Sequence, residues 1–298
     1  MIRVLALLAA VLAAAAAVQG SQAAFTATKT NAGSAFTTIA NFAPAVTLTT
    51  PAAGATTSGT PTLSGAAGTS PGDSTTVTVK IYIGASTAGT LTQTLTPTAT
   101  GATWTATAAP ALASGTYTAQ ATQTDTGGAT GTSAAVTFTV DATKPTATAV
   151  VATNKPAGTA GKIESGDTIT FTYSEAITAA SVWSGWNGAS ATVHVRLTQA
   201  GNNDTFTVLD TSDVALDLGS VATGGNYVSA TSTFASTMVR SADGASVIVT
   251  LGTPSGIQGT AVTAKDMSWT VGAGIKDLVG NIIATPANWT ETVSTVDF

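Results

Sequence analysis

Carboxylate side chains offer the clearest chemistry in this sequence, which contains fifteen acidic residues, one histidine and no cysteine. Asp141 follows an alternating apolar stretch, and Asp277 and Asn281 flank the motif Asp-Leu-Val-Gly-Asn. Calcium binds carboxylate, amide and carbonyl oxygens that loops supply. Asp141, Asp277 and Asn281 are therefore candidate calcium ligands. The alternative for the motif is a tight turn in which Gly280 adopts a positive φ and polar side chains cap backbone groups.

The residues that catalysis needs are poorly represented. His194 stands between two valines of an alternating stretch, so we expect it to face solvent beside Arg196. A Ser-His-Asp triad needs that histidine next to an activated serine, and no Gly-x-Ser-x-Gly motif accompanies it. Acidic residues recur at 164–175 and 204–217, but without the aromatic-lined motif expected around a glycoside hydrolase site. The sequence predicts a protein that is not an enzyme, with a secreted hydrolase as a weak alternative.

Two tryptophans lie close together outside the alternating stretches. Trp183 and Trp186 belong to a Gly/Ser-rich loop, where an exposed indole could stack on a sugar ring. They are therefore candidate ligand-binding residues for polysaccharide. The alternative is that both close the end of a domain core. The other three tryptophans, Trp104, Trp269 and Trp289, lie in alternating stretches and are expected in the core.

Composition restricts the classes of partner. Charged residues are only 8% of the chain, and threonine, which is β-branched and favours strands, carries much of the polar share. The net charge is −5, and residues 145–298 contain six basic against twelve acidic side chains. No basic patch is available to neutralise phosphates, so a nucleic-acid partner is not expected.

Residues 45–143 predict one β-sandwich domain, because short alternating apolar stretches recur there with turn residues between them. The clearest is 77–83, where valines and isoleucines alternate with polar residues. Seven strands are expected in total, at 45–50, 61–66, 77–83, 91–95, 102–107, 115–125 and 136–140. The stretch 141–145 contains a proline, which stops strand pairing, and is predicted to be the hinge into a second domain.

Residues 144–298 predict a second β-sandwich that is longer than a minimal one and so carries an insertion or extra strands. Ile169, Phe171 and Tyr173 share one face of an early strand. Further strands are expected at 191–197, 205–209, 246–251, 267–271 and 288–296.

Short motifs recur at the strand ends of both halves. They are Pro51-x-x-Gly54, Gly115-Thr-Tyr117, the stretch 136–145, the stretch 166–175 (Gly-Asp-Thr-Ile-Thr-Phe-Thr-Tyr-Ser-Glu) and Asp277-Leu-Val-Gly-Asn281. The first three resemble the bacterial Ig-like domains of surface proteins and adhesins, and the last two resemble the Ig-like type found in surface-layer proteins. The resemblance implies tandem immunoglobulin-like sandwiches. Tyr117 is further predicted to form a tyrosine corner.

The N-terminal segment predicts export. Arg3 precedes an apolar run that is shorter than the about 20 residues of a membrane span, and small residues at 21–23 fit a cleavage site. Residues 1–24 are thus a predicted signal peptide, with an uncleaved anchor as the alternative. Residues 25–44 are Thr/Ser-rich and resemble the start of mature biofilm-matrix and camelysin-type proteins. Such a segment is either a spacer or a strand donated to a neighbouring sheet edge, which would be self-assembly.

Together these features predict an all-β protein of two tandem immunoglobulin-like β-sandwiches, at 45–143 and 144–298. We expect it to be secreted or held at the cell surface. The expected function is structural or adhesive, with cell-surface or matrix components as partners, polysaccharide among them. A carbohydrate-binding module acting through Trp183 and Trp186 is the alternative. Calcium is the one cofactor that the residues suggest.

Overall fold

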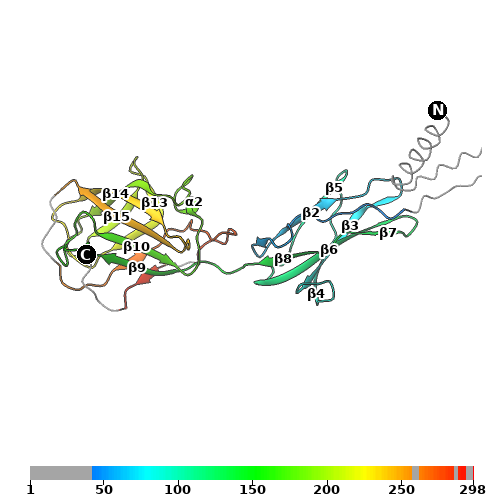
Figure 1. The fold of residues 1–298 in the computed structure, drawn as a ribbon, viewed down its shortest axis with the longest axis horizontal. Coiled ribbons are helices and arrows are strands. Elements are labelled where there is room, and N and C mark those ends of the chain that lie inside the picture. Colours follow the sequence, from blue (N-terminus) through cyan, green and yellow to red (C-terminus); the bar gives the residue numbers. More distant parts are fainter. Residues whose placement is uncertain (1–41, 257–261, 285–287, 293–297) are drawn as a thin grey trace, which may run out of the picture. The chain divides into compact units, whose positions relative to one another are not determined.

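The computed structural model describes residues 42–256, 262–284, 288–292 and 298, which form an all-β structure (Figure 1). One domain ends with β8 (Val136–Val140), and a second begins with β9 (Ala147–Thr153). Each domain has its own cluster of buried apolar side chains. The predicted all-β fold class with two domains is therefore confirmed.

The first domain contains two sheets. The larger sheet has the order β1 (Thr56–Thr57), β8, β6 (Gly115–Asp125), β3 (Asp73–Ile83) and β4 (Leu91–Leu95), with β7 (Thr130–Thr132) also paired to β6. The smaller sheet pairs β2 (Thr62–Ala66) with β5 (Thr103–Thr107). The predicted first strand, 45–50, is not a regular strand, but the N–H groups of Thr47 and Thr49 donate to carbonyl oxygens of β2 at 3.0 and 2.9 Å. The other six predicted strands occur where the sequence places them.

Apolar residues that alternate along the strands form the core of the first domain. Val77, Val79 and Ile81 of β3 are fully buried, and Leu63 of β2 and Trp104 of β5 belong to the same cluster. Threonines supply most of the exposed intervening positions, as in Thr62 of β2 and Thr103 and Thr105 of β5, and Lys80 fills one of them in β3.

A tyrosine in β6 forms a hydrogen bond with the backbone just before this strand. The hydroxyl of Tyr117 donates to the carbonyl oxygen of Ala113 at 3.1 Å. This is the backbone contact just upstream that defines a tyrosine corner. The predicted role of Tyr117 is confirmed.

The second domain is one continuous antiparallel sheet of nine strands. Their order is β17 (Asn288–Thr290), β16 (Ser268–Thr270), β13 (Ala215–Ala222), β12 (Thr205–Leu209), β11 (Ala191–Thr198), β14 (Ser232–Arg240), β15 (Ser246–Pro254), β10 (Thr168–Tyr173) and β9. The end strands β17 and β9 contact one another, so the sheet curves around a single core. The short helix α2 (Ala179–Val182) follows β10.

Three strands of the second domain, β9, β13 and β14, were not predicted. In β9 alanines and threonines predominate, and in β14 Ser232 and Ser236 occupy fully buried positions, so small or polar residues remove the apolar alternation that marks a strand. In β13 the buried residues Leu218 and Val221 are three positions apart, which interrupts the period of two. The stretch 180–265 nevertheless supplies central strands of the sheet, because β11 pairs on both sides, with β12 and β14.

The predicted signal peptide, nearly all of the Thr/Ser-rich segment and most of the C-terminal stretch 291–298 lie outside the described residues. Within the described ranges, no helix has the length and apolar character that a membrane span requires.

Candidate functional site

Three acidic side chains meet where the linker after β8 approaches the second domain. One carboxylate oxygen from each of Asp141, Glu175 and Asp277 lies within 4.8 Å of the other two. Asp141 directly follows β8, Glu175 lies two residues beyond β10, and Asp277 begins the turn 277–281. The sequence predicted Asp141 and Asp277 as separate candidates. The structure brings them together and adds Glu175.

The turn 277–281 holds Asp277 in place. Its Oδ1 atom accepts hydrogen bonds from the backbone N–H groups of Val279, Gly280 and Asn281 at 2.9, 2.6 and 2.8 Å. Gly280 has a φ of 97°, a conformation that glycine adopts without strain. The predicted tight turn is thus present, and it orients the carboxylate of Asp277 within the acidic cluster.

Long-range pairing brings Glu175 to this turn. Ile177 forms an antiparallel bridge with Asp277, and the hydroxyl of Thr178 donates to the carbonyl oxygen of Asp277 at 2.6 Å. Glu175 is only two residues before this bridge. Its position therefore depends on contacts between segments about one hundred residues apart, which spacing in the sequence does not reveal.

Asn281 connects the linker with the turn 277–281. Its amide Nδ2 donates to the carbonyl oxygen of Asp141 at 2.8 Å and to Oδ2 of Asp277 at 2.7 Å. The amide nitrogen is a donor and does not bind a cation, whereas calcium binds an asparagine through its amide oxygen. Asn281 ties the linker to the turn and positions the two aspartates, and its assignment as a calcium ligand stays a prediction.

Glu175 is electrostatically uncompensated. Its Oε1 atom is buried and has no hydrogen-bond partner in the structure. Burial raises the pKa of the Glu175 carboxyl, and the negative charges of Asp141 and Asp277 raise it further. Glu175 is partly buried, and the free-energy cost of burying its unpaired oxygen falls when a proton or a cation neutralises the charge.

The donor set fits a hard cation. Asp141, Glu175 and Asp277 each offer one carboxylate oxygen, and the buried Oε1 of Glu175 is free to accept an ion. Calcium prefers such oxygen ligands in loops. A calcium ion would supply the positive charge that the three carboxylates lack among themselves.

The two candidate tryptophans have different environments. Trp186 is only 7% exposed, and its Nε1–H donates to the carbonyl oxygen of Ala189 at 2.7 Å. Its assignment as a sugar-stacking residue is corrected, because its ring is part of the core. Trp183 is half-buried against the same core and lines a surface hollow. A ligand-binding role for Trp183 therefore stays a prediction.

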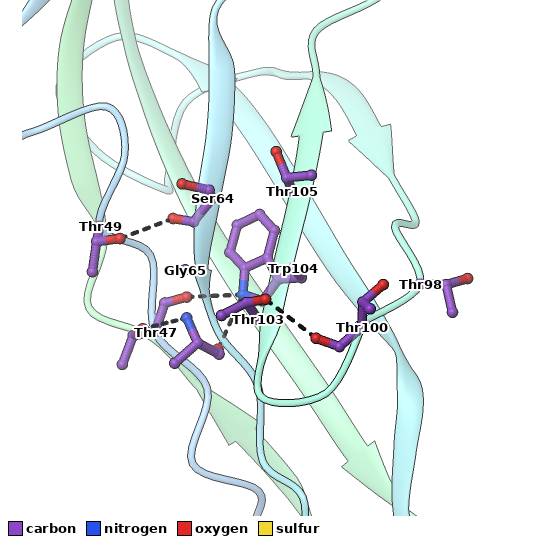
Figure 2. Close-up of a pocket in the computed structure, with 10 residues that line it drawn as sticks. Thr47, Thr49, Ser64, Gly65, Thr98, Thr100, Thr103, Trp104 and Thr105 are labelled. Carbon is purple, nitrogen blue, oxygen red and sulfur yellow. Dashed lines mark hydrogen bonds between the residues drawn. The ribbon is translucent and has the colours of Figure 1, made fainter.

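Another hollow lies on the first domain. Figure 2 shows threonine and serine side chains gathered around the pairing of β2 with β5. Trp104 adjoins this hollow, but it is 2% exposed, and its Nε1–H donates to the carbonyl oxygens of Thr47 and Ala66 at 3.1 and 3.0 Å. The indole thus fastens the stretch 45–50 to β2 and has no face available for a ligand.

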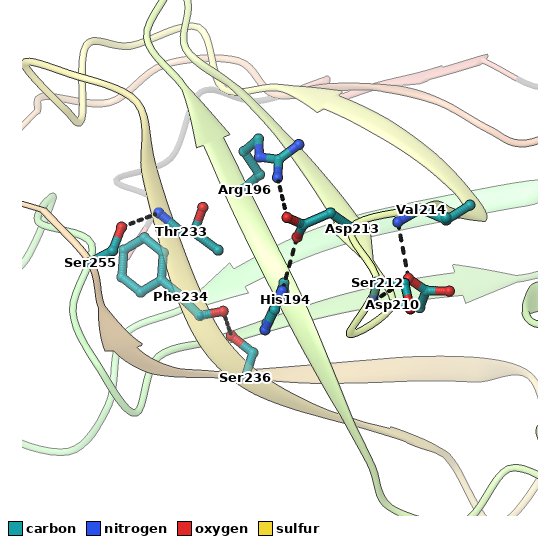
Figure 3. A network of polar contacts seen from close by, with 10 residues as sticks. All are labelled: His194, Arg196, Asp210, Ser212, Asp213, Val214, Thr233, Phe234, Ser236 and Ser255. Carbon is teal, nitrogen blue, oxygen red and sulfur yellow. Dashed lines mark hydrogen bonds and ion pairs between the residues drawn. The ribbon is translucent and has the colours of Figure 1, made fainter.

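His194 pairs with the acidic residue Asp213. Its Nδ1 lies 3.0 Å from Oδ1 of Asp213, whose Oδ2 lies 3.2 Å from Arg196 (Figure 3). Ser236 lies opposite Val193 on the buried face, and its hydroxyl donates to the carbonyl oxygen of Phe234. His194 and Ser236 therefore belong to opposite faces of the sheet and do not form a nucleophile–base pair.

The other acidic residues of the second domain largely hold loops. Asp204 is fully buried, and its carboxylate accepts the N–H groups of Ala200, Tyr227 and Val228 at 2.8–2.9 Å. Asp210 accepts two backbone N–H groups of its own turn. Asp204 and Asp210 thus stabilise turns.

Residues 47–142 match the family model described as "Bacterial Ig-like domain". This match covers the described first domain almost completely, from the stretch before β2 to the residue after Asp141. The first domain is therefore similar to bacterial Ig-like domains. No curated protein matches the chain.

Two solved structures are similar to the chain. One contains fibronectin(III)-like modules of Clostridium thermocellum CbhA, with 15% identity, a TM-score of 0.24, and coverage of 72% of this chain and 92% of the other. The second is a tetra-tandem repeat from the extending region of a large adhesion protein, with 15% identity and a TM-score of 0.26. It covers 86% of this chain, and the chain spans 66% of the repeat structure. Similarity at this level does not carry a function across.

Proposed function

We propose that this chain is a secreted or cell-surface structural protein whose two β domains space or present an adhesive surface outside the cell. Support comes from the bacterial Ig-like domain at 47–142, since such domains are generally found on surface or secreted proteins and are typically non-catalytic. The second domain has its own core, so each domain can act as a stiff unit. The expected partners are cell-surface or matrix components.

The acidic cluster at the linker is the proposed calcium site of this protein. The observation that carries it is the buried, unpartnered Oε1 of Glu175 beside the carboxylates of Asp141 and Asp277. An ion held by Asp141 from the linker and by Glu175 and Asp277 from the second domain restricts the movement of the linker. Calcium would then stiffen the tandem arrangement that a spacer needs.

A thermal unfolding experiment tests this site. The purified chain is melted in calcium and in EDTA, since an ion that binds only the folded state stabilises it by about 2.7 kcal/mol at a hundredfold excess over Kd. We expect a higher Tm of the second domain in calcium. Glu175→Gln should abolish that shift, whereas Asp243→Asn, in an exposed turn of the same domain, should retain it.

Two outcomes would contradict the calcium site. One is an equal Tm in calcium and EDTA for the unmodified chain. The other is a calcium-dependent shift that survives in both Glu175→Gln and Asp141→Asn, because the ion would then bind elsewhere. Isothermal titration of calcium into the metal-free chain gives an independent measure of binding.

A further inference from the structure

We propose that the hollow beside Trp183 binds amino sugars of an extracellular polysaccharide. The hollow has a volume of about 520 Å³ and combines apolar and acidic residues. Its apolar wall includes Trp183, Val214 and Leu216, and its acidic wall includes Asp210 and Asp217. This inference goes beyond the structural role proposed above, because it gives the second domain a ligand of defined chemistry.

The apolar wall is held in place before a ligand arrives. Trp183 ends α2, its backbone N–H donates to the carbonyl oxygen of Ala179 at 3.3 Å, and part of its side chain packs on the core. Val214 is 61% exposed, so an apolar side chain is left open to solvent in the same wall. The faces of pyranose rings are apolar and pack on an indole in such settings.

The acidic wall is also pre-organised. Oδ1 of Asp210 accepts the N–H groups of Ser212 and Val214 at 2.8 and 3.0 Å, which leaves Oδ2 for a ligand. Asp217 lies against Gly272 and Gly274, where an added Cβ would come within 2.2 and 1.9 Å of its carboxylate oxygens. Only glycine at these two positions leaves room for this placement of the carboxylate.

The charge of the hollow selects among sugars. Among the residues that line it, none is basic. The basic side chains next to the turn 210–214, His194 and Arg196, are already paired with Asp213 (Figure 3). Uronate and sulfated sugars would therefore meet two acidic residues in the lining, with Lys276 beside the lining residue Ser181 as a nearby basic residue, whereas a sugar ammonium group would be attracted by the two acidic residues. The complementary ligand is an amino sugar with a free amine.

The test uses oligosaccharides as probes and the full chain in EDTA, so that the calcium site does not influence the result. Glucosamine oligomers are titrated by calorimetry, with N-acetylglucosamine and polyuronate oligomers of equal length for comparison. We expect saturable binding of glucosamine oligomers, weaker binding of the acetylated oligomers and none of the uronates. Absence of saturable glucosamine binding, or uronate binding of equal strength, would overturn the proposal.

Variants locate the binding. Val214→Lys places a positive charge in the hollow at an exposed position, so the fold is retained and affinity for glucosamine oligomers should fall about tenfold or more. Val151→Lys, at an exposed position of β9, is the matched control and should bind as the unmodified chain does. Asp217→Asn should remove the preference for glucosamine over N-acetylglucosamine. Equal affinity of the two lysine variants would show that this hollow is not the binding site.

Discussion

At the scale of single residues, Glu175 makes the stability of the folded protein depend on pH. Its raised pKa means that the folded, metal-free protein binds a proton more readily than the unfolded chain does. Stability from protonated Glu175 is therefore present below its folded pKa and lost as pH rises through that value. The relevant pH range begins just above the ordinary carboxyl value of 4.5.

The raised pKa of Glu175 predicts how the stability of the variant Glu175→Gln depends on pH. In EDTA at neutral pH, the variant should be more stable than the unmodified chain, because it removes a partly buried negative charge near those of Asp141 and Asp277. The difference should disappear as the pH falls towards 4.5 and Glu175 becomes protonated. Denaturant unfolding of both proteins across this range measures it. A difference that is constant with pH would show that Glu175 is not the titrating group.

In the presence of calcium, acidification at Glu175 should have the opposite effect on stability from its effect in EDTA. Protons and calcium compete for its carboxylate, so the stabilisation by calcium should decrease as the solution is acidified. Comparing calcium and EDTA at each pH separates the two effects. A calcium effect that increases on acidification would contradict the assignment of carboxylate ligands.

At the scale of elements, side chains rather than regular pairing fasten irregular segments to the sheets. The indole N–H of Trp104 donates hydrogen bonds to the carbonyl oxygens of Thr47 and Ala66 and so holds the stretch 45–50 against β2. Asn281 likewise ties the linker to the turn after residue 276. Both contacts join segments that are far apart in the sequence.

The Trp104 contact can be tested by Trp104→Phe. The variant keeps an aromatic ring in the core but loses the N–H that donates to the carbonyl oxygens of Thr47 and Ala66. We expect the first domain to lose about 1–3 kcal/mol of stability, since two hydrogen bonds of about 0.5–1.5 kcal/mol each are removed. Tyr117→Phe, which removes a single hydrogen bond to Ala113, should cost about 1 kcal/mol. Urea unfolding followed by circular dichroism compares the two, and a larger loss for Tyr117→Phe would contradict this ranking.

At the scale of the whole molecule, two separate cores predict two units of folding. The buried cluster of the first domain contains Leu63, and that of the second contains Val195. Truncating a buried leucine to alanine costs about 2–5 kcal/mol. Leu63→Ala should therefore lower one calorimetric transition and leave the other unchanged, while Val195→Ala should do the reverse. A single transition that moves equally in both variants would show that the domains unfold as one unit.

Much of the fold could be predicted from the sequence, because period-two alternation directly encodes a half-buried strand. Val77, Val79 and Ile81, and likewise Ile169, Phe171 and Tyr173, are buried as their spacing predicts. Where alternation is weak, as in β14 with its buried serines, the strand was missed. There the burial of small polar residues is set by neighbouring strands and not by the local pattern.

The sequence by itself determined the candidate ligands Asp141 and Asp277 and the turn at Gly280, since turn chemistry is local and depends on residue type. Only the tertiary structure decided that the two aspartates meet, that Glu175 joins them, and that the amide of Asn281 donates hydrogen bonds to Asp141 and Asp277. It also separated Trp183, beside an open hollow, from the buried Trp186. The physical reason is that both distinctions depend on contacts between distant segments, which place one side chain near a charge and bury another.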